Sequence, residues 1–138
     1  MPPTDPNDPA APPALLQIGD VAEHTGLSLR TIRHYEEVGL LPEPRRSPGG
    51  FRLYAPAAVE RLLLIKAMKP LDFTLEEMRD LIEVRDRLAD PSLPPPMRRD
   101  LVERLRTYHR LLEHRIARLR ERIESAEAFS AQLRIEID

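Results

Sequence analysis

The C-terminal part of this chain constrains its fold more than any other feature, because residues 97–138 contain neither glycine nor proline. Those two residues normally end helices, so the stretch predicts one helix from about Met97 to about Leu133. At 1.5 Å per residue it would be roughly 55 Å long. One stripe of this helix carries apolar residues three or four positions apart: Leu101, Leu105, Tyr108, Leu112, Ile116, Leu119, Ile123 and Ala126. A stripe of this kind requires a partner surface.

The simplest partner for the stripe is the same helix of a second subunit. We therefore expect a homodimer held by a coiled coil over residues 97–138, with the stripe from Leu101 to Ile123 as the dimerisation surface. The alternative is a helical hairpin within one chain. Only the helix predicted before the linker over 89–96 is long enough to cover part of the stripe.

The rest of the chain divides at prolines. Six prolines within residues 1–14 predict a disordered tail, and Pro91 to Pro96 predict a stiff linker. Between them, residues 15–88 form the predicted N-terminal domain. Because most of the predicted elements are helices, we expect a mainly α fold.

The predicted domain begins with two short helices. Gly26-Leu27-Ser28 separates them, with Gly26 suited to a left-handed turn and Ser28 to an N-cap. The second helix runs from Leu29 to about Val38. Residues 43–54 then predict a small hairpin, because residues 45–50 are rich in turn-forming residues and residues 51–54 alternate between apolar and polar positions as a strand does.

Two further helices complete the domain. A third begins at Pro56 and ends near Pro70, and it is expected to bury Val59, Leu62, Leu63 and Met68. The capping-box sequence from Thr74 to Glu77 starts a fourth, which ends near Leu88.

The two short helices and the hairpin together indicate DNA binding. The second helix brings Arg30, Thr31, Arg33, His34 and Tyr35 close together, and a helix of this kind enters the major groove. Arg45, Arg46 and Arg52 flank the hairpin tip, where Gly49 and Gly50 let the backbone approach a phosphate. This hairpin is a basic wing. An arginine-rich helix alone is often only a solvated surface, but a wing beside it favours DNA.

The charge distribution agrees with this interpretation. Residues 26–70 carry a net charge of +4, against −6 for the rest of the chain. The formal total of −2 shows that the protein is no general polycation. A basic region on an acidic protein suits a nucleic-acid surface.

Other classes of protein find little support. The chain has no cysteine, which excludes disulfides and thiolate metal sites within it. No apolar run reaches the roughly 18 residues of a membrane span, and no leader sequence opens the chain, so we expect a cytoplasmic protein. We find no nucleophile–base set or phosphate loop, and expect neither an enzyme nor a cofactor. The competing interpretation is a protein-interaction module that uses the long helix and keeps a vestigial DNA-binding domain.

Several motifs together resemble the MerR family of regulators. They are Ile18-Gly19-Asp20-Val21-Ala22, Gly26-Leu27-Ser28, Arg30 to Glu36, Gly39-Leu40-Leu41, Gly50 to Tyr54 and Asp72 to Met78. The resemblance covers roughly residues 16–88. It implies a winged helix-turn-helix domain followed by a long helix that pairs antiparallel with its mate.

The resemblance also implies roles for residues at matching positions. Arg30, Arg33, His34 and Tyr35 would serve the groove, and Arg46, Gly49, Phe51 and Arg52 the wing. Lys66 and Lys69 would support phosphates. Many members repress a promoter or distort its DNA so that RNA polymerase can start.

Three positions depart from the family pattern. Phe51 replaces the usual tyrosine and so lacks one hydroxyl. Asp72 replaces glycine at a turn, where aspartate tolerates the left-handed conformation. Pro70 is expected to end the third helix early and to shift Lys69.

The sequence allows three alternatives for what the regulator senses. His109 and Glu113 are four apart and form half of a metal site or a solvated helix surface. Tyr108 and Phe129 line a small-molecule pocket at the dimer seam or belong to the core. A regulator without any ligand is the third alternative.

Overall fold

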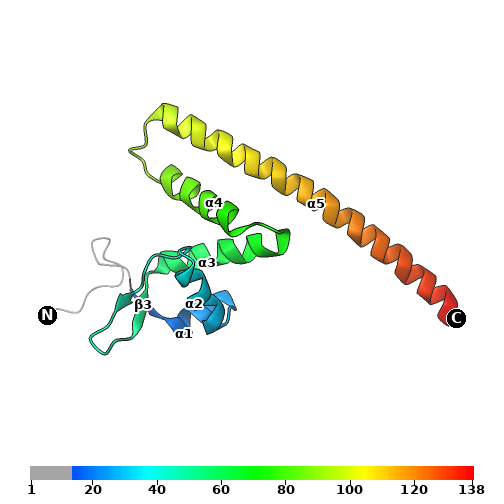
Figure 1. Cartoon of the computed structure of the whole chain (residues 1–138), viewed down its shortest axis with the longest axis horizontal. Helices are drawn as coiled ribbons and strands as arrows, with labels where there is room; N and C mark the ends of the chain where they lie inside the picture. The colour runs from blue at the N-terminus through cyan, green and yellow to red at the C-terminus, as the bar shows by residue number, and fades with distance from the viewer. Residues whose placement is uncertain (1–13) are drawn as a thin grey trace. The chain divides into compact units, whose positions relative to one another are not determined.

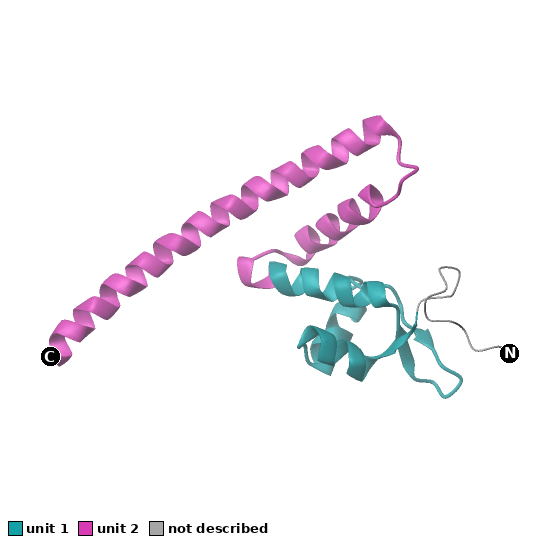
Figure 2. Ribbon diagram, turned by 180° about the vertical axis from the view of Figure 1, so that it is seen from behind, with its two compact units in different colours: residues 1–68 teal, residues 69–138 magenta. Residues whose placement is uncertain are grey.

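The computed structural model describes residues 14–138 (Figure 1). The tail predicted over 1–14 lies outside the described residues, except for its last position. The chain divides after Met68 into unit 1, residues 1–68, and unit 2, residues 69–138 (Figure 2). The fourth helix, which the sequence pattern groups with the N-terminal domain, belongs to unit 2.

Unit 1 opens with the predicted helix-turn-helix. Helix α1 spans Ile18–Thr25 and helix α2 spans Leu29–Glu37. Gly26 ends α1 with a φ of 70°, in the left-handed region that glycine adopts without strain. Ser28 caps α2, its hydroxyl oxygen accepting a 3.1 Å hydrogen bond from the Thr31 amide. Both predicted turn residues are confirmed.

The hairpin is confirmed and joins a third strand. Strand β2, Arg45–Arg46, pairs antiparallel with β3, Arg52–Tyr54, so that Arg46 lies opposite Arg52. Strand β1, Leu16–Gln17, pairs with the other edge of β3. The sheet order is therefore β1-β3-β2. The sequence did not predict β1, because two residues are too few to show an alternating pattern.

Helix α3, Pro56–Met68, supplies much of the core of unit 1. Its buried positions are Ala58, Leu62, Ile65 and Met68, at helical spacing. Helix α3 packs against α1, and Val21 of α1 and Ile32 of α2 are also fully buried. The expectation for Leu63 is wrong, because this side chain lies off the buried stripe and is 45% exposed. Val59 is half-buried.

Unit 2 begins with a short 3₁₀ turn, η1, Lys69–Leu71. Helix α3 stops before Pro70, as predicted from the missing proline N–H. Asp72 has a φ of 61°, so this aspartate does adopt the left-handed conformation usually left to glycine. Helix α4, Leu75–Leu88, follows with Thr74 as its N-cap and the complete capping box.

Helix α5 is one continuous helix of 43 residues, Pro95–Ile137. It begins two residues earlier and ends four residues later than predicted, with Pro95 in the first turn. At 1.5 Å per residue it is roughly 65 Å long. None of the described helices is long and apolar enough to cross a membrane.

The apolar stripe of α5 has two different environments. Helix α4 packs against its N-terminal part, where Leu101 is 3% exposed and the stripe stays half-buried as far as Leu119. From Ile123 onward every residue is exposed. The intrachain hairpin therefore exists, but it covers only the first part of the stripe.

Candidate nucleic-acid interface

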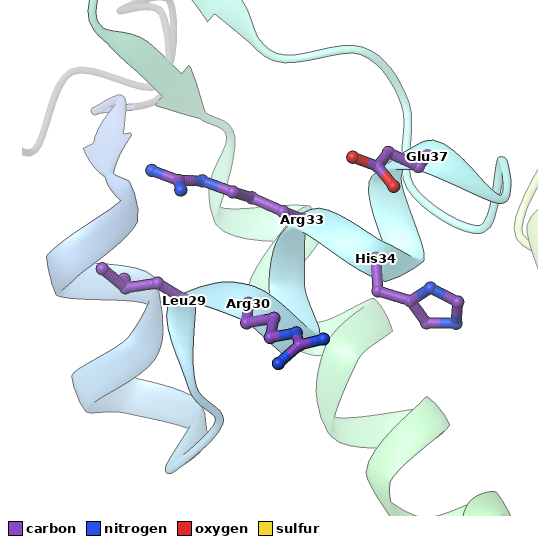
Figure 3. Close-up of a pocket in the computed structure, with 5 residues that line it drawn as sticks. All are labelled: Leu29, Arg30, Arg33, His34 and Glu37. Atoms are coloured by element: carbon purple, nitrogen blue, oxygen red, sulfur yellow. The ribbon is translucent and has the colours of Figure 1, made fainter.

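Helix α2 presents one face to solvent and the other to the core. A hollow on the exposed face is lined by Leu29, Arg30, Arg33, His34 and Glu37 (Figure 3). Ile32 and Tyr35 occupy the opposite face and are 0% and 3% exposed. The structure thus brings Arg30, Arg33 and His34 together, as expected of groove-facing residues.

Two predicted groove residues are placed differently. Tyr35 packs into the core beside the ring of His34, 5.5 Å away between centroids, instead of lying on the exposed face. Thr31 is half-buried, and its hydroxyl oxygen accepts a 2.9 Å hydrogen bond from Ser28 within the helix cap. Thr31 therefore supports the start of α2.

The wing comprises β2, β3 and the turn between them. Ser47 closes the turn, because its amide donates to the Phe51 carbonyl at 2.9 Å and its hydroxyl accepts from the Phe51 amide at 3.1 Å. Gly50 turns the chain with a φ of 83°. A side chain at Gly49 would begin only 3.2 Å from the Phe51 ring. Glycine here lets that ring lie against the turn.

Two exposed cations precede the wing turn on β2. Arg45 and Arg46 are both exposed, and the guanidinium of Arg46 donates to the Gly50 carbonyl at 3.1 Å. This bond holds the charge of Arg46 beside the turn. Phe51 is 67% exposed, so the departure from tyrosine leaves an apolar ring near the tip.

Arg52 has a partner within the protein. Its Nε lies 3.4 Å from Oε1 of Glu36, without hydrogen-bond geometry, and its side chain is 32% exposed. The other carboxylate oxygen of Glu36 accepts a 2.8 Å hydrogen bond from the Tyr54 hydroxyl. Arg52 and Tyr54 thereby connect the wing to α2 through a carboxylate that is only 14% exposed.

Sequence reasoning missed Glu36 and Tyr54 as residues that position the interface. A signal existed, because at about 100° per residue Glu36 falls close to the buried Ile32 on the inner face of α2. A charged residue on an inner face requires a partner. Burial, followed by the hydrogen bond to Glu36 and its negative charge, raises the pKa of Tyr54 to about 12.

Lys66 lies against the end of α1. Its ammonium donates a 2.8 Å hydrogen bond to the Thr25 carbonyl and so caps that helix. A side chain at Gly26 would begin 3.1 Å from this nitrogen. A lysine has three donors, so two remain for a phosphate. Lys69 belongs to unit 2 and is not placed relative to this surface.

Within unit 2, Tyr108, one of the predicted dimerisation residues, makes contacts within its own chain. Tyr108 donates a 2.5 Å hydrogen bond to Oδ2 of Asp80 on α4, and Arg104 pairs with the same carboxylate. The Tyr108 ring also stacks 6.4 Å from the buried Phe73 ring. Burial and the negative charge of Glu77 raise the pKa of Tyr108. Tyr108 thus anchors α5 to α4 in one chain.

Arg115 attaches α5 to the start of α4. Its guanidinium donates to the Leu71 carbonyl at 3.1 Å, lies 3.3 Å from Oε1 of Glu77, and stands over the Phe73 ring at 4.7 Å. Hydrogen bonding by Thr74, then by Arg115, lowers the pKa of Glu77. The sequence pattern showed the capping box but not this partner.

The suggested metal half-site is an exposed pair. Nε2 of His109 lies 3.4 Å from Oε1 of Glu113. Among residues 14–138, no three histidine or acidic side chains gather as metal ligands would.

The fold and the basic face define a winged helix-turn-helix regulator. The family model described as MerR HTH family regulatory protein matches residues 16–84, and the model described as MerR, DNA binding matches residues 59–134. The chain belongs to the MerR family of helix-turn-helix regulators, whose members bind DNA and control transcription.

Individual relatives of the chain are regulatory proteins, in agreement with the family models. The HTH-type transcriptional regulator YfmP of Bacillus subtilis is 34% identical over 125 residues, which cover 86% of this chain and 87% of that protein. The mercuric resistance operon regulatory protein of Bacillus cereus is 46% identical over 71 residues, 51% of this chain and 54% of that protein. The chain's match thus spans about half the length of the latter.

A solved structure matches as well. The transcription regulator PbrR691 from Ralstonia metallidurans CH34, in complex with lead(II), is 34% identical with a TM-score of 0.53. The match covers 86% of this chain and 82% of that one. Family membership favours transcription control over the interaction-module interpretation.

Proposed function

We propose that this chain binds promoter DNA as a homodimer, inserting the exposed face of α2 into the major groove and gripping the backbone with the wing. One observation carries the proposal. Arg30, Arg33 and His34 share the solvent face of a helix that is capped, packed and braced by the wing through Glu36. A rigid helix bearing forked donors is what base and phosphate recognition requires.

The wing has the properties of a backbone-binding element. Arg45 and Arg46 are exposed on β2, directly before a turn that has no side chain at Gly49 and Gly50. Such contacts position a protein on the duplex without reading its sequence. We therefore assign base reading to α2 and positioning to the wing.

Dimerisation through α5 has two supports. The stripe continues past the reach of α4, where Ile123 is 56% exposed and Leu133 is 41% exposed. Charge is also divided along the helix, with a net charge of +5 over residues 97–122 and −3 over 123–138. Antiparallel pairing places the positive part of one helix beside the negative part of the other, which favours that orientation.

We further propose that the bound dimer distorts the promoter and that RNA polymerase is the partner that uses the distorted DNA. Family membership supports this step. Chemical footprinting of the spacer between promoter elements tests it, since unstacked bases react and a straight duplex does not.

A gel shift tests the central proposal. The probe is the promoter upstream of the gene itself, with a scrambled duplex of equal length as control. We expect wild type to retain the promoter at lower protein concentration than the scrambled duplex, and Arg33→Ala to lose that preference while keeping its fold. Equal retention of both duplexes by wild type would contradict sequence-specific binding.

A further inference from the structure

One residue on the proposed DNA-binding surface is negatively charged, which opposes non-specific binding to the phosphates of DNA. Glu37 is exposed and lines the same hollow as Arg30, Arg33 and His34 (Figure 3). At about 100° per residue, Glu37 falls within about 40° of both Arg30 and Arg33 around α2. Around the helix axis it therefore lies between Arg30 and Arg33, at the C-terminal end of the exposed face.

Glu37 also lacks an internal role. No hydrogen bond or ion pair joins its carboxylate to another side chain in residues 14–138, whereas its neighbour Glu36 is 14% exposed and binds Arg52 and Tyr54. A carboxylate facing the DNA is repelled by phosphates. Docking would leave it desolvated without a partner unless a base supplies a donor.

The major groove offers this donor selectively. A carboxylate only accepts hydrogen bonds. In the major groove, guanine presents the acceptors N7 and O6 and thymine presents the acceptor O4, so neither base can donate to a carboxylate there. Adenine presents its N6 donor beside the N7 acceptor, which opposes a carboxylate. Cytosine presents the N4 amino group alone.

We propose that Glu37 accepts a hydrogen bond from the N4 amino group of a cytosine in each operator half-site and so determines base preference at that position. This inference rests on the proposed function. The competing role for Glu37 is repulsion alone, which would weaken binding to every sequence equally. The two roles predict different effects of substitution.

The test selects bound duplexes from a library with a randomised centre, using the full chain as wild type, Glu37→Gln and Glu37→Ala. Glutamine has a donor and an acceptor and pairs with the N6 and N7 of adenine. We expect wild type to enrich cytosine at one position of each half-site, Glu37→Gln to shift that position toward adenine, and Glu37→Ala to lose the preference. Glu60→Gln is the control, because it removes an exposed acid of the same unit from α3.

Fluorescence anisotropy on the selected site then gives the size of the effect. Replacing the cytosine should weaken wild-type binding by about five- to tenfold, and should leave Glu37→Ala unchanged within about twofold. Identical enrichment by wild type and both Glu37 variants, with uniformly tighter binding, would overturn the inference and leave the proposed function intact. Enrichment of no sequence by wild type would instead overturn the proposed function, and this inference with it.

Discussion

The hydroxyl of Tyr54 donates a 2.8 Å hydrogen bond to Oε2 of Glu36 and so joins the wing to the recognition helix α2. Tyr54 is 2% exposed and Glu36 is only 14% exposed in its side chain. A hydrogen bond to a charged acceptor in such a place is worth more than an exposed one. This bond therefore ties strand β3 of the wing directly to α2.

Removing the hydroxyl should therefore destabilise unit 1. We expect Tyr54→Phe to lower the free energy of unfolding by about 1.5–3 kcal/mol, because the buried carboxylate loses a partner. Urea denaturation measures this. Tyr35→Phe is the matched control, since Tyr35 is equally buried but has no hydroxyl partner within residues 14–138. An equal loss in both variants would show that the bond to Glu36 is not responsible.

The same bond predicts a dependence on alkaline pH. The pKa of Tyr54 rises from 10.0 to about 12 on folding, chiefly through burial. Below pH 10.0 the phenol is protonated in both states, and the full stability is present. As pH rises further the unfolded chain loses the proton first, so stability should fall by about 1.4 kcal/mol per pH unit until the folded phenol ionises.

The measurement compares the urea midpoints of wild type and Tyr54→Phe between pH 10.0 and the raised pKa. Tyr54→Phe lacks this titration, so the two midpoints should converge as pH rises. A constant difference between them across that range would exclude the raised pKa.

In unit 2, the capping box should dominate the stability of α4. Glu77 accepts hydrogen bonds from Thr74 and Arg115, whereas Glu76 lies in the same helical turn, exposed. We expect Glu77→Ala to cost about 1–2 kcal/mol in unfolding free energy and Glu76→Ala less than about 0.5 kcal/mol. Both variants remove one charge from the first turn, so the helix dipole cancels in the comparison.

The pH dependence of this difference has the opposite sign to that of Tyr54. Folding lowers the pKa of Glu77 below 4.5, so its contribution is present above that value and disappears as pH falls through the folded pKa. Thermal unfolding of the two variants in acid measures the loss. A difference that persisted after protonation would assign the effect to packing instead.

The salt dependence of DNA binding separates the wing from the recognition helix. Each neutralised phosphate adds about 0.9 to the slope of log K against log salt, so losing the two copies of Arg46 in a dimer should reduce it by roughly 1 to 2. Arg46→Ala should weaken all sequences about equally. Arg33→Ala should instead weaken the operator more than random DNA. Titration by anisotropy at several salt concentrations measures both.

Two further variants complete the salt experiment. Arg46 also binds the Gly50 carbonyl, so Arg45→Ala, which leaves that bond intact, checks whether lost charge or a loosened turn is responsible. Arg134→Ala removes an exposed arginine from the end of α5 and should leave the slope unchanged. An unchanged slope in both wing variants would mean that the wing does not contact the backbone.

Local sequence patterns predicted the parts of the fold that local chemistry determines. Gly26 and Ser28 mark the helix-turn-helix, and Thr74 with Glu77 marks the start of α4, because caps and left-handed turns depend on a few adjacent residues. Asp72 adopts the left-handed conformation for the same local reason.

Contacts between distant positions were not predictable in this way. Lys66 meets Thr25 across 41 residues, and Arg115 meets Leu71 across 44. The inward placement of Tyr35 depends on which face of α2 the core covers. Once the buried Ile32 defines that face, helical geometry accounts for Tyr35, Glu36 and Glu37 together. The exposed cations of the interface were predicted from their type and spacing, and the residues that hold them in place were not.

The last prediction concerns the exposed end of α5. Replacing Leu112 and Leu119 would also disturb α4, because both are half-buried within one chain. Ile123 is an exposed stripe residue, and Leu133 is exposed seven residues after Ala126, only about 20° from it around the helix. Changing both to Asp should therefore remove the dimer contact without disturbing the core of unit 2. Each apolar side chain buried is worth roughly 1.5–3 kcal/mol, and a buried carboxylate adds a desolvation cost.

Sedimentation velocity at micromolar concentration should show wild type as a dimer and the Ile123→Asp, Leu133→Asp variant as a folded monomer that binds the operator weakly. Ile135→Asp is the control, because Ile135 is 77% exposed and lies about 120° from Ile123 around the helix. It should remain a dimer. If wild type sediments as a monomer, α5 is no dimerisation helix. If Ile135→Asp dissociates as readily as the double variant, the interface does not follow the stripe.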